Sequence, residues 1–323
     1  AGVYVSETNS DTRGRFDKME IARTKDDQGN EYIVVAERAE DADIGLDLCR
    51  DHWLRLSLWR IDGYAEGHAG RLTRLDKWVA ESRDCDAVEE LDLTIVNQKY
   101  AAVIFRGHHE KNRLAIFELD FSAPKIRLLY NEIVSEELYD HSIGITTAYE
   151  DILVYVAQYS TGWRLASESW TGSARQFHSV TSIRADERLL DMTTVKRLDY
   201  SQPDYIGGYY VVAVTKEGRH LRIYSWEVTP DGMLTLRGQI DTVDGEDYLV
   251  GREADWERAS ISSLYWKNRP GFVIVGKGVA REIRDVDGDW QQSAKGLKVL
   301  YGYIMDDGRP TVESSNVTGS GDP

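Results

Sequence analysis

The stretch Arg222-Ile-Tyr-Ser-Trp-Glu-Val-Thr-Pro-Asp-Gly232 is an apolar strand with an aromatic residue near its end, followed by a Pro-Asp-Gly turn. Related stretches occur four more times along the chain. Their aromatic residues lie 58, 53, 56 and 77 residues apart, at Trp59, Phe117, Trp170, Trp226 and Tyr303. A recurrence of several strands with a period of this size is typical of a repeat architecture.

The rest of the chain divides into runs of Val, Ile, Tyr, Trp and Leu that are broken by Gly, Asp and Asn, which predicts β-strands in groups of four. The second run of each group is apolar throughout, as in Tyr209-Tyr-Val-Val-Ala-Val214, and such runs suit strands that are buried on both faces. We expect strands at 16–25, 31–38, 53–61 and 72–81; at 88–96, 99–106, 112–120 and 125–134; at 142–149, 151–159, 163–170 and 174–183; at 189–198, 208–215, 220–229 and 234–243; and at 259–266, 271–276, 297–305 and 310–317.

Radial packing of four-stranded sheets buries the middle strands in this way, whereas a β-sandwich requires apolar and polar residues to alternate. We therefore predict an all-β fold, a five-bladed β-propeller of four-stranded antiparallel blades, as a single domain over residues 1–323. A six-bladed or irregular propeller is the alternative. The blades are expected at 16–82, 83–135, 136–183, 184–243 and 244–318, after an N-terminal arm over 1–15.

The layout resembles five-bladed propellers as a class across residues 16–317. That class includes tachylectin-like lectins and several glycoside hydrolase families. The resemblance is one of architecture, and an architecture hosts many functions.

The composition limits the possible partners. The 323 residues carry a net charge of −16, which does not suit binding to phosphates or to anionic membranes, and no apolar run approaches the ~18 residues that span a bilayer. We therefore predict neither nucleic acid nor membrane as a partner. A pair of cysteines, Cys49 and Cys85, and the sequon at Asn316 predict a secreted glycoprotein with one disulfide. Two unpaired thiols are the alternative. We also expect the protein to be a monomer.

Propeller topology places the loops between second and third strands, and those between blades, at one end of each sheet, which we call the upper end. The long loops 39–52, 244–258 and 277–296 are expected there, and uneven loops at one end favour a single composite site over one sugar site in each blade. The catalytic candidates are the imidazoles and guanidinium groups that would polarise a substrate at this end, namely His52, His141, Arg188 and Arg258. The substrate-binding candidates are Trp53, Asp86, His108, Tyr139, Trp256 and Trp290.

Alternatives exist for these residues. Arg188 and Arg258 each follow a glutamate, Glu187 or Glu257, and pairing between these charges would connect blades without any chemistry. Part of a calcium loop is present at Asp285, Asp287 and Asp289, but the usual downstream carboxylate is missing. We therefore predict no cofactor, with calcium as the alternative. The sequence holds no serine elbow, zinc helix, P-loop or Rossmann fingerprint.

These observations predict a secreted, single-site propeller enzyme of the lyase or cyclase type. It would act on a natural-product-like small molecule by positioning it and polarising it with hydrogen bonds. The first alternative is a carbohydrate-binding lectin or a glycoside hydrolase, which needs two carboxylates beside the scissile bond. The second is a ligand-binding protein without catalysis.

Overall fold

The computed structural model describes residues 19–39, 53–63, 70–80, 88, 90–106, 111–135, 143–159, 162–172, 174–182, 187–198, 206–217, 220–241, 258–266, 269–278, 282–284, 290–292 and 296–318. Every regular element within these ranges is a β-strand. A search of the same ranges finds no helix suited to crossing a membrane.

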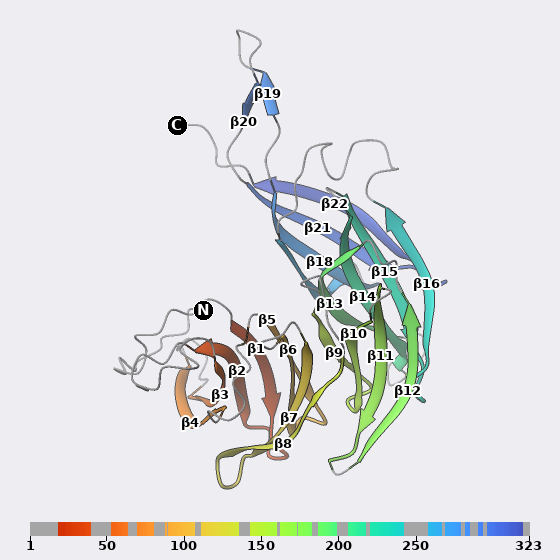
Figure 1. Cartoon of the computed structure of the whole chain (residues 1–323). Helices are drawn as coiled ribbons and strands as arrows, with labels where there is room; N and C mark the ends of the chain where they lie inside the picture. The colour runs from red at the N-terminus through yellow and green to blue at the C-terminus, as the bar shows by residue number, and fades with distance from the viewer. Residues whose placement is uncertain are drawn as a thin grey trace. The chain divides into compact units, whose positions relative to one another are not determined.

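Twenty of the strands form five four-stranded antiparallel sheets, in which each strand pairs with the next in the sheet (Figure 1). The first sheet contains β1 (Met19–Lys25), β2 (Glu31–Ala39), β3 (Trp53–Asp62) and β4 (Arg71–Val79). The second contains β5 (Glu90–Val96), β6 (Tyr100–Arg106), β7 (Asn112–Asp120) and β8 (Lys125–Ile133). The third contains β9 (Ile145–Ala148), β10 (Ile152–Tyr159), β11 (Gly162–Trp170) and β12 (Arg175–Ser182).

The fourth sheet contains β13 (Arg188–Leu198), β14 (Ile206–Glu217), β15 (His220–Val228) and β16 (Leu234–Asp241). The fifth contains β17 (Arg258–Trp266), β18 (Arg269–Gly278), β21 (Gly296–Ile304) and β22 (Pro310–Thr318). Every strand expected from the sequence is present, with ends that shift by three residues or fewer. The fold is the five-bladed β-propeller that the repeat predicts.

One element differs from the prediction. The sequence predicts a loop over 277–296, but this segment contains a two-stranded hairpin, β19 (Glu282–Arg284) and β20 (Trp290–Gln292), between β18 and β21 (Figure 1). Strands of three residues are too short to show the alternation of polar and apolar residues that identifies a strand in a sequence.

The chain forms two compact units, which are described separately. The first unit comprises Ala1–Thr161 and Ser169–Gln176, and the second comprises Gly162–Glu168 and Phe177–Pro323. In the first, the innermost strands β1, β5 and β9 contact one another in turn, and its core includes Leu56, Val103 and Phe117. In the second, β13 contacts β17, and its core includes Val212 and Phe272. Packing of innermost strand on innermost strand is the radial arrangement of propeller blades.

The recurring aromatic residue marks a β-bulge. The pairing of third and fourth strands slips by one residue at the same place in four sheets, just before Trp59, Phe117, Trp226 and Gly302. Phe117 and Trp226 are fully buried there. These two rings therefore serve packing, as their repetition in the sequence suggests.

The fifth sheet has a glycine, and not an aromatic residue, at the bulge. Its bulge residue is Gly302, and the aromatic Tyr303 identified in the sequence lies one position further on. A Cβ atom on Gly302 would lie 2.3 Å from the Phe272 ring, which reaches across from the paired residue on β18. An aromatic ring from the second strand thus fills the space that the third strand fills in other sheets.

Candidate functional site

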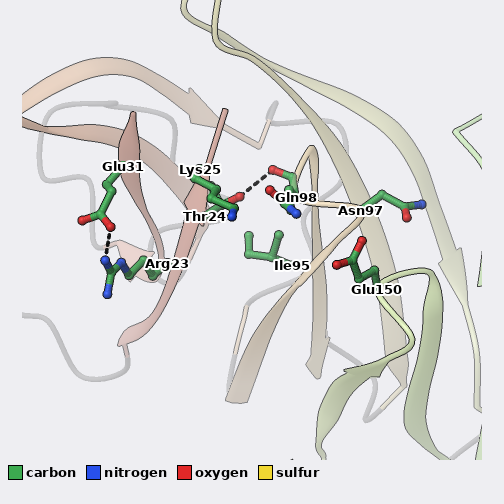
Figure 2. A pocket seen from close by; sticks show the side chains of 8 residues that line it. All are labelled: Arg23, Thr24, Lys25, Glu31, Ile95, Asn97, Gln98 and Glu150. Atoms are coloured by element: carbon green, nitrogen blue, oxygen red, sulfur yellow. Dashed lines mark hydrogen bonds and ion pairs between the residues drawn. The ribbon is translucent and has the colours of Figure 1, made fainter. Parts of the chain in front are cut away.

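An open groove of about 480 Å³ lies in the first unit, at the lower end of its sheets, opposite the upper end where second and third strands connect (Figure 2). The end of β1 and the start of β2 form one side, while β5 and the tight turns after β5 and β9 form the other. The lining residues are Arg23, Thr24, Lys25, Glu31, Ile95, Asn97, Gln98 and Glu150.

Hydrogen bonds between strands and turns hold the groove together. The Thr24 side chain is buried, and its Oγ1 donates to the Gln98 carbonyl at 2.5 Å, which fixes β1 against the β5–β6 turn. The Asn97 backbone N–H donates to the Glu150 carbonyl at 2.7 Å, and the Asn97 side-chain amide donates to the Trp170 carbonyl at 3.0 Å. Polar contacts at this end therefore join the first sheet, the second sheet and the part of the third sheet that belongs to the first unit.

Both turns that border the groove have a strained backbone. Asn97 and Gln98 have φ angles of 48° and 56°, and Tyr149 and Glu150 have φ angles of 47° and 62°. The connections 97–99 and 149–151 are three residues long, and each places two residues in the left-handed region. A side chain there costs roughly 1–2 kcal/mol unless the residue is glycine. Among the residues that the structure describes, these four are the only non-glycine residues with positive φ. Strain of this kind clusters at binding and catalytic sites.

The groove combines one satisfied ion pair with several side chains that have no protein partner. Arg23 pairs with Glu31 at the surface. By contrast, the described part of the chain offers no hydrogen bond or ion pair to the side chains of Lys25, Gln98 and Glu150. A primary amide, an ammonium group and a carboxylate thus face the groove with their hydrogen-bonding capacity directed at solvent.

Most of the site predicted from the sequence falls outside the described residues. The backbones of Trp53, Arg258, Trp290 and Asn316 lie in β3, β17, β20 and β22, but their side chains are outside the described part. The residues that lie wholly outside it are Cys49, His52, Cys85, Asp86, His108, Tyr139, His141, Trp256, Asp285, Asp287 and Asp289. The disulfide, the glycosylation site, calcium binding and the catalytic roles stay predictions.

Arg188 is the predicted site residue whose side chain the structure describes, and it is half-buried at the start of β13. Its neighbour Glu187 is 1% exposed. The Glu187 carboxylate accepts hydrogen bonds from Thr215 Oγ1 at 2.7 Å and from the Tyr224 hydroxyl at 2.7 Å, and it pairs with the Arg222 guanidinium. Burial, together with the hydrogen bond to Glu187, raises the pKa of the Tyr224 phenol.

The contacts of this cluster lie within the fourth sheet, and they give Glu187 a structural role. Both of its carboxylate oxygens accept hydrogen bonds from the fourth sheet itself. A catalytic carboxylate needs an oxygen that reaches the substrate. Glu187 instead stabilises the upper end of one blade.

The groove was missed in the sequence for a specific reason. The sequence predicts a site among the long loops at the upper ends, whereas short turns at the lower ends form the groove. One signal was present in the sequence. The turns at Asn97-Gln98 and Tyr149-Glu150 join adjacent strands but contain no glycine, which tight hairpin turns usually carry where φ is positive.

No protein-family model and no curated protein matches the chain. Several solved structures are similar in fold. A protein from Lactobacillus plantarum has a TM-score of 0.45 at 9% identity, over 93% of this chain and 96% of that one. A β-xylosidase/α-arabinofuranosidase of glycoside hydrolase family 43 from a compost metagenome, in complex with xylotriose, has a TM-score of 0.43 at 14% identity, over 93% and 98%.

Trypanosoma rangeli sialidase in complex with sialic acid has a TM-score of 0.49 at 10% identity, over 91% of this chain and 45% of that one. The chain therefore spans less than half the length of the sialidase. At these identities the likeness is one of fold alone.

Proposed function

We propose that the protein recognises a saccharide in the groove of its first unit. The observation that supports this function is the set of side chains without protein partners, Lys25, Gln98 and Glu150, around an open groove of about 480 Å³. Amide, ammonium and carboxylate groups together donate and accept hydrogen bonds, as the hydroxyl groups of a sugar require. The volume lies within the usual range of small-molecule sites.

The lining favours a polar ligand over an apolar one. Ile95 is the single apolar residue among those that line the groove. An apolar natural product would remove the surrounding polar groups from water without replacing their hydrogen bonds, which costs free energy for each group. The lyase or cyclase hypothesis concerns the upper ends of the sheets and stays a separate prediction.

The lining also favours recognition over hydrolysis. Cleavage of a glycosidic bond uses two carboxylates with separate roles. The groove has two carboxylates, but Glu31 is engaged by Arg23. Glu150 is then the one carboxylate that has no partner within the described residues lining the groove.

A glycan array screened with the purified protein, followed by titration calorimetry on the oligosaccharides that bind, tests this proposal. Gln98→Ala removes the amide and should weaken binding by about fivefold, because a hydrogen bond in a site contributes about 1 kcal/mol. The matched control is Gln239→Ala, which removes an exposed amide from β16 in the second unit and should leave affinity unchanged. Absence of any saccharide binding, or an equal effect of the two variants, would refute the function.

A further inference from the structure

We propose that the saccharide is zwitterionic, with both an ammonium group and a carboxylate. This inference deepens the proposed function and rests on it. The supporting observation is that charge is separated along the groove. Figure 2 shows Arg23, Glu31 and Lys25 towards one side, Glu150 at the other, and Ile95 and Gln98 between them.

The charges that remain after pairing have opposite signs. Arg23 and Glu31 neutralise each other. Lys25 then contributes one positive charge on the β1 side, and Glu150 one negative charge on the β9–β10 turn, neither with a partner in the described part of the chain. The groove is thus electrically neutral overall but has a positive half and a negative half.

A ligand with a single charge meets an opposing one. An anionic sugar that pairs with Lys25 also approaches Glu150, in a protein whose net charge of −16 repels anions. A cationic sugar that pairs with Glu150 approaches Lys25. A neutral sugar uses neither charge. A ligand with its carboxylate towards Lys25 and its ammonium group towards Glu150 pairs both.

The frame around these two charges is fixed, which makes such discrimination possible. Lys25 follows Thr24, whose hydroxyl is bonded to the β5–β6 turn, and the Glu150 carbonyl accepts from the Asn97 backbone N–H in that same turn. The backbones that carry the two charges are therefore held at a set separation by a shared turn. A preorganised pair of charges loses less free energy to ordering when a ligand binds.

The experiment uses three forms of one tetrasaccharide of alternating glucuronate and glucosamine: the zwitterionic form with free amines, the N-acetylated form and the carboxyl-reduced form. Calorimetry on the intact protein at low salt should show the zwitterionic form binding about two- to fivefold more tightly than either singly charged form, as expected for exposed ion pairs. The preference should shrink at high salt because exposed charges are screened.

Substitutions assign each preference to one residue. Glu150→Gln should abolish the preference for the free amine and keep the preference for the carboxylate, while Lys25→Gln should do the reverse. Asp27→Asn removes an exposed carboxylate near β1 that does not line the groove, and should keep both preferences.

The outcomes separate the two proposals. Equal binding of all three forms, or an equal loss for all forms in Glu150→Gln, overturns the zwitterion inference and leaves saccharide recognition standing. If no form binds and the glycan array is also empty, the proposed function falls, and the inference falls with it.

Discussion

Two glutamates at opposite ends of their sheets show how the protein uses its polar groups. Glu187, in the second unit, is buried and takes hydrogen bonds or an ion pair from Thr215, Tyr224 and Arg222. Glu150, in the first unit, is exposed on a strained turn, and no described residue pairs with its carboxylate. The Glu187 carboxylate serves the fold, whereas the Glu150 carboxylate is available to a ligand.

The largest expected effect comes from breaking the cluster of polar contacts around Glu187. Glu187→Ala removes the carboxylate and with it the ion pair to the Arg222 guanidinium, which is 7% exposed. Breaking a buried ion pair by removing one partner costs about 3–5 kcal/mol, so the free energy of unfolding measured in urea should fall by that amount.

Glu150→Ala is the matched control, because loss of an exposed carboxylate without a partner should change stability by about 0.5 kcal/mol or less. A similar loss of stability in both variants would contradict the assignment of a structural role to Glu187 and not to Glu150.

The next effect compares a packed turn with an open one. Gly308 and Gly29 both have left-handed φ angles, of +87° and +82°. A Cβ atom on Gly308 would lie 2.7 Å from Arg237 Cγ and 2.9 Å from the Tyr210 ring, whereas a Cβ atom on Gly29 would meet nothing within 4 Å. Both alanine variants lose about 1 kcal/mol to backbone strain, and Gly308→Ala should lose about 1–3 kcal/mol more to overpacking.

Thermal unfolding of the two variants side by side measures this difference. The Gly308 carbonyl also accepts a hydrogen bond from Ser225 Oγ at 2.6 Å, and the same contact joins Ser167 to Gly232 at 2.5 Å. If Gly308→Ala were no worse than Gly29→Ala, this repeated contact between the third strand of one sheet and a turn of the next would not be a tight packing site.

The sequence predicts the fold well because its evidence is local. Each strand is a short apolar run, and each turn carries its own Gly, Asp or Asn, so the five sets of four strands follow from neighbouring residues. The groove depends on contacts between distant residues. Thr24 and Gln98 are 74 positions apart, and their hydrogen bond exists only after two blades pack. No local pattern reports that packing, so exposed residues such as Lys25 look like an ordinary charged surface.

A third change tests whether the strain at the groove serves binding. Gln98→Gly removes the cost of a side chain in the left-handed region, roughly 1–2 kcal/mol, but adds about 0.5–1 kcal/mol of backbone entropy. The variant should therefore be more stable by about 0.5–1 kcal/mol and bind the saccharide more weakly, a trade of stability for function. Calorimetry and urea unfolding measure the two quantities on one sample. Stabilisation with unchanged affinity would mean that the Gln98 amide does not contact the ligand.

The smallest effects concern pH, and the two units should respond with opposite signs. Hydrogen bonds, first of all from the Asn30 side chain at 2.8 Å, lower the pKa of Asp26 in the first unit. Burial raises the pKa of Asp191 in the second unit, although this carboxylate accepts hydrogen bonds from the Ile261 backbone and from Ser260. A lowered pKa contributes stability above the unfolded-state value near 3.8 that is lost as pH falls, whereas a raised pKa contributes stability at low pH that is lost as pH rises.

Asp26→Asn should therefore lower the unfolding temperature near pH 6, with a difference from the wild type that narrows towards pH 3. For Asp191→Asn, the unfolding temperature of the wild type should rise relative to that of the variant as the pH falls, because burial favours the protonated form of Asp191. Unfolding temperatures of the wild type and the two variants are measured across this pH range. The difference between the wild type and each variant is plotted against pH, and the sign of each slope tests the prediction even where the shifts are small. Slopes of the same sign would mean that Asp191 is solvated like the turn aspartates, and that its contact with β17 does not bury it.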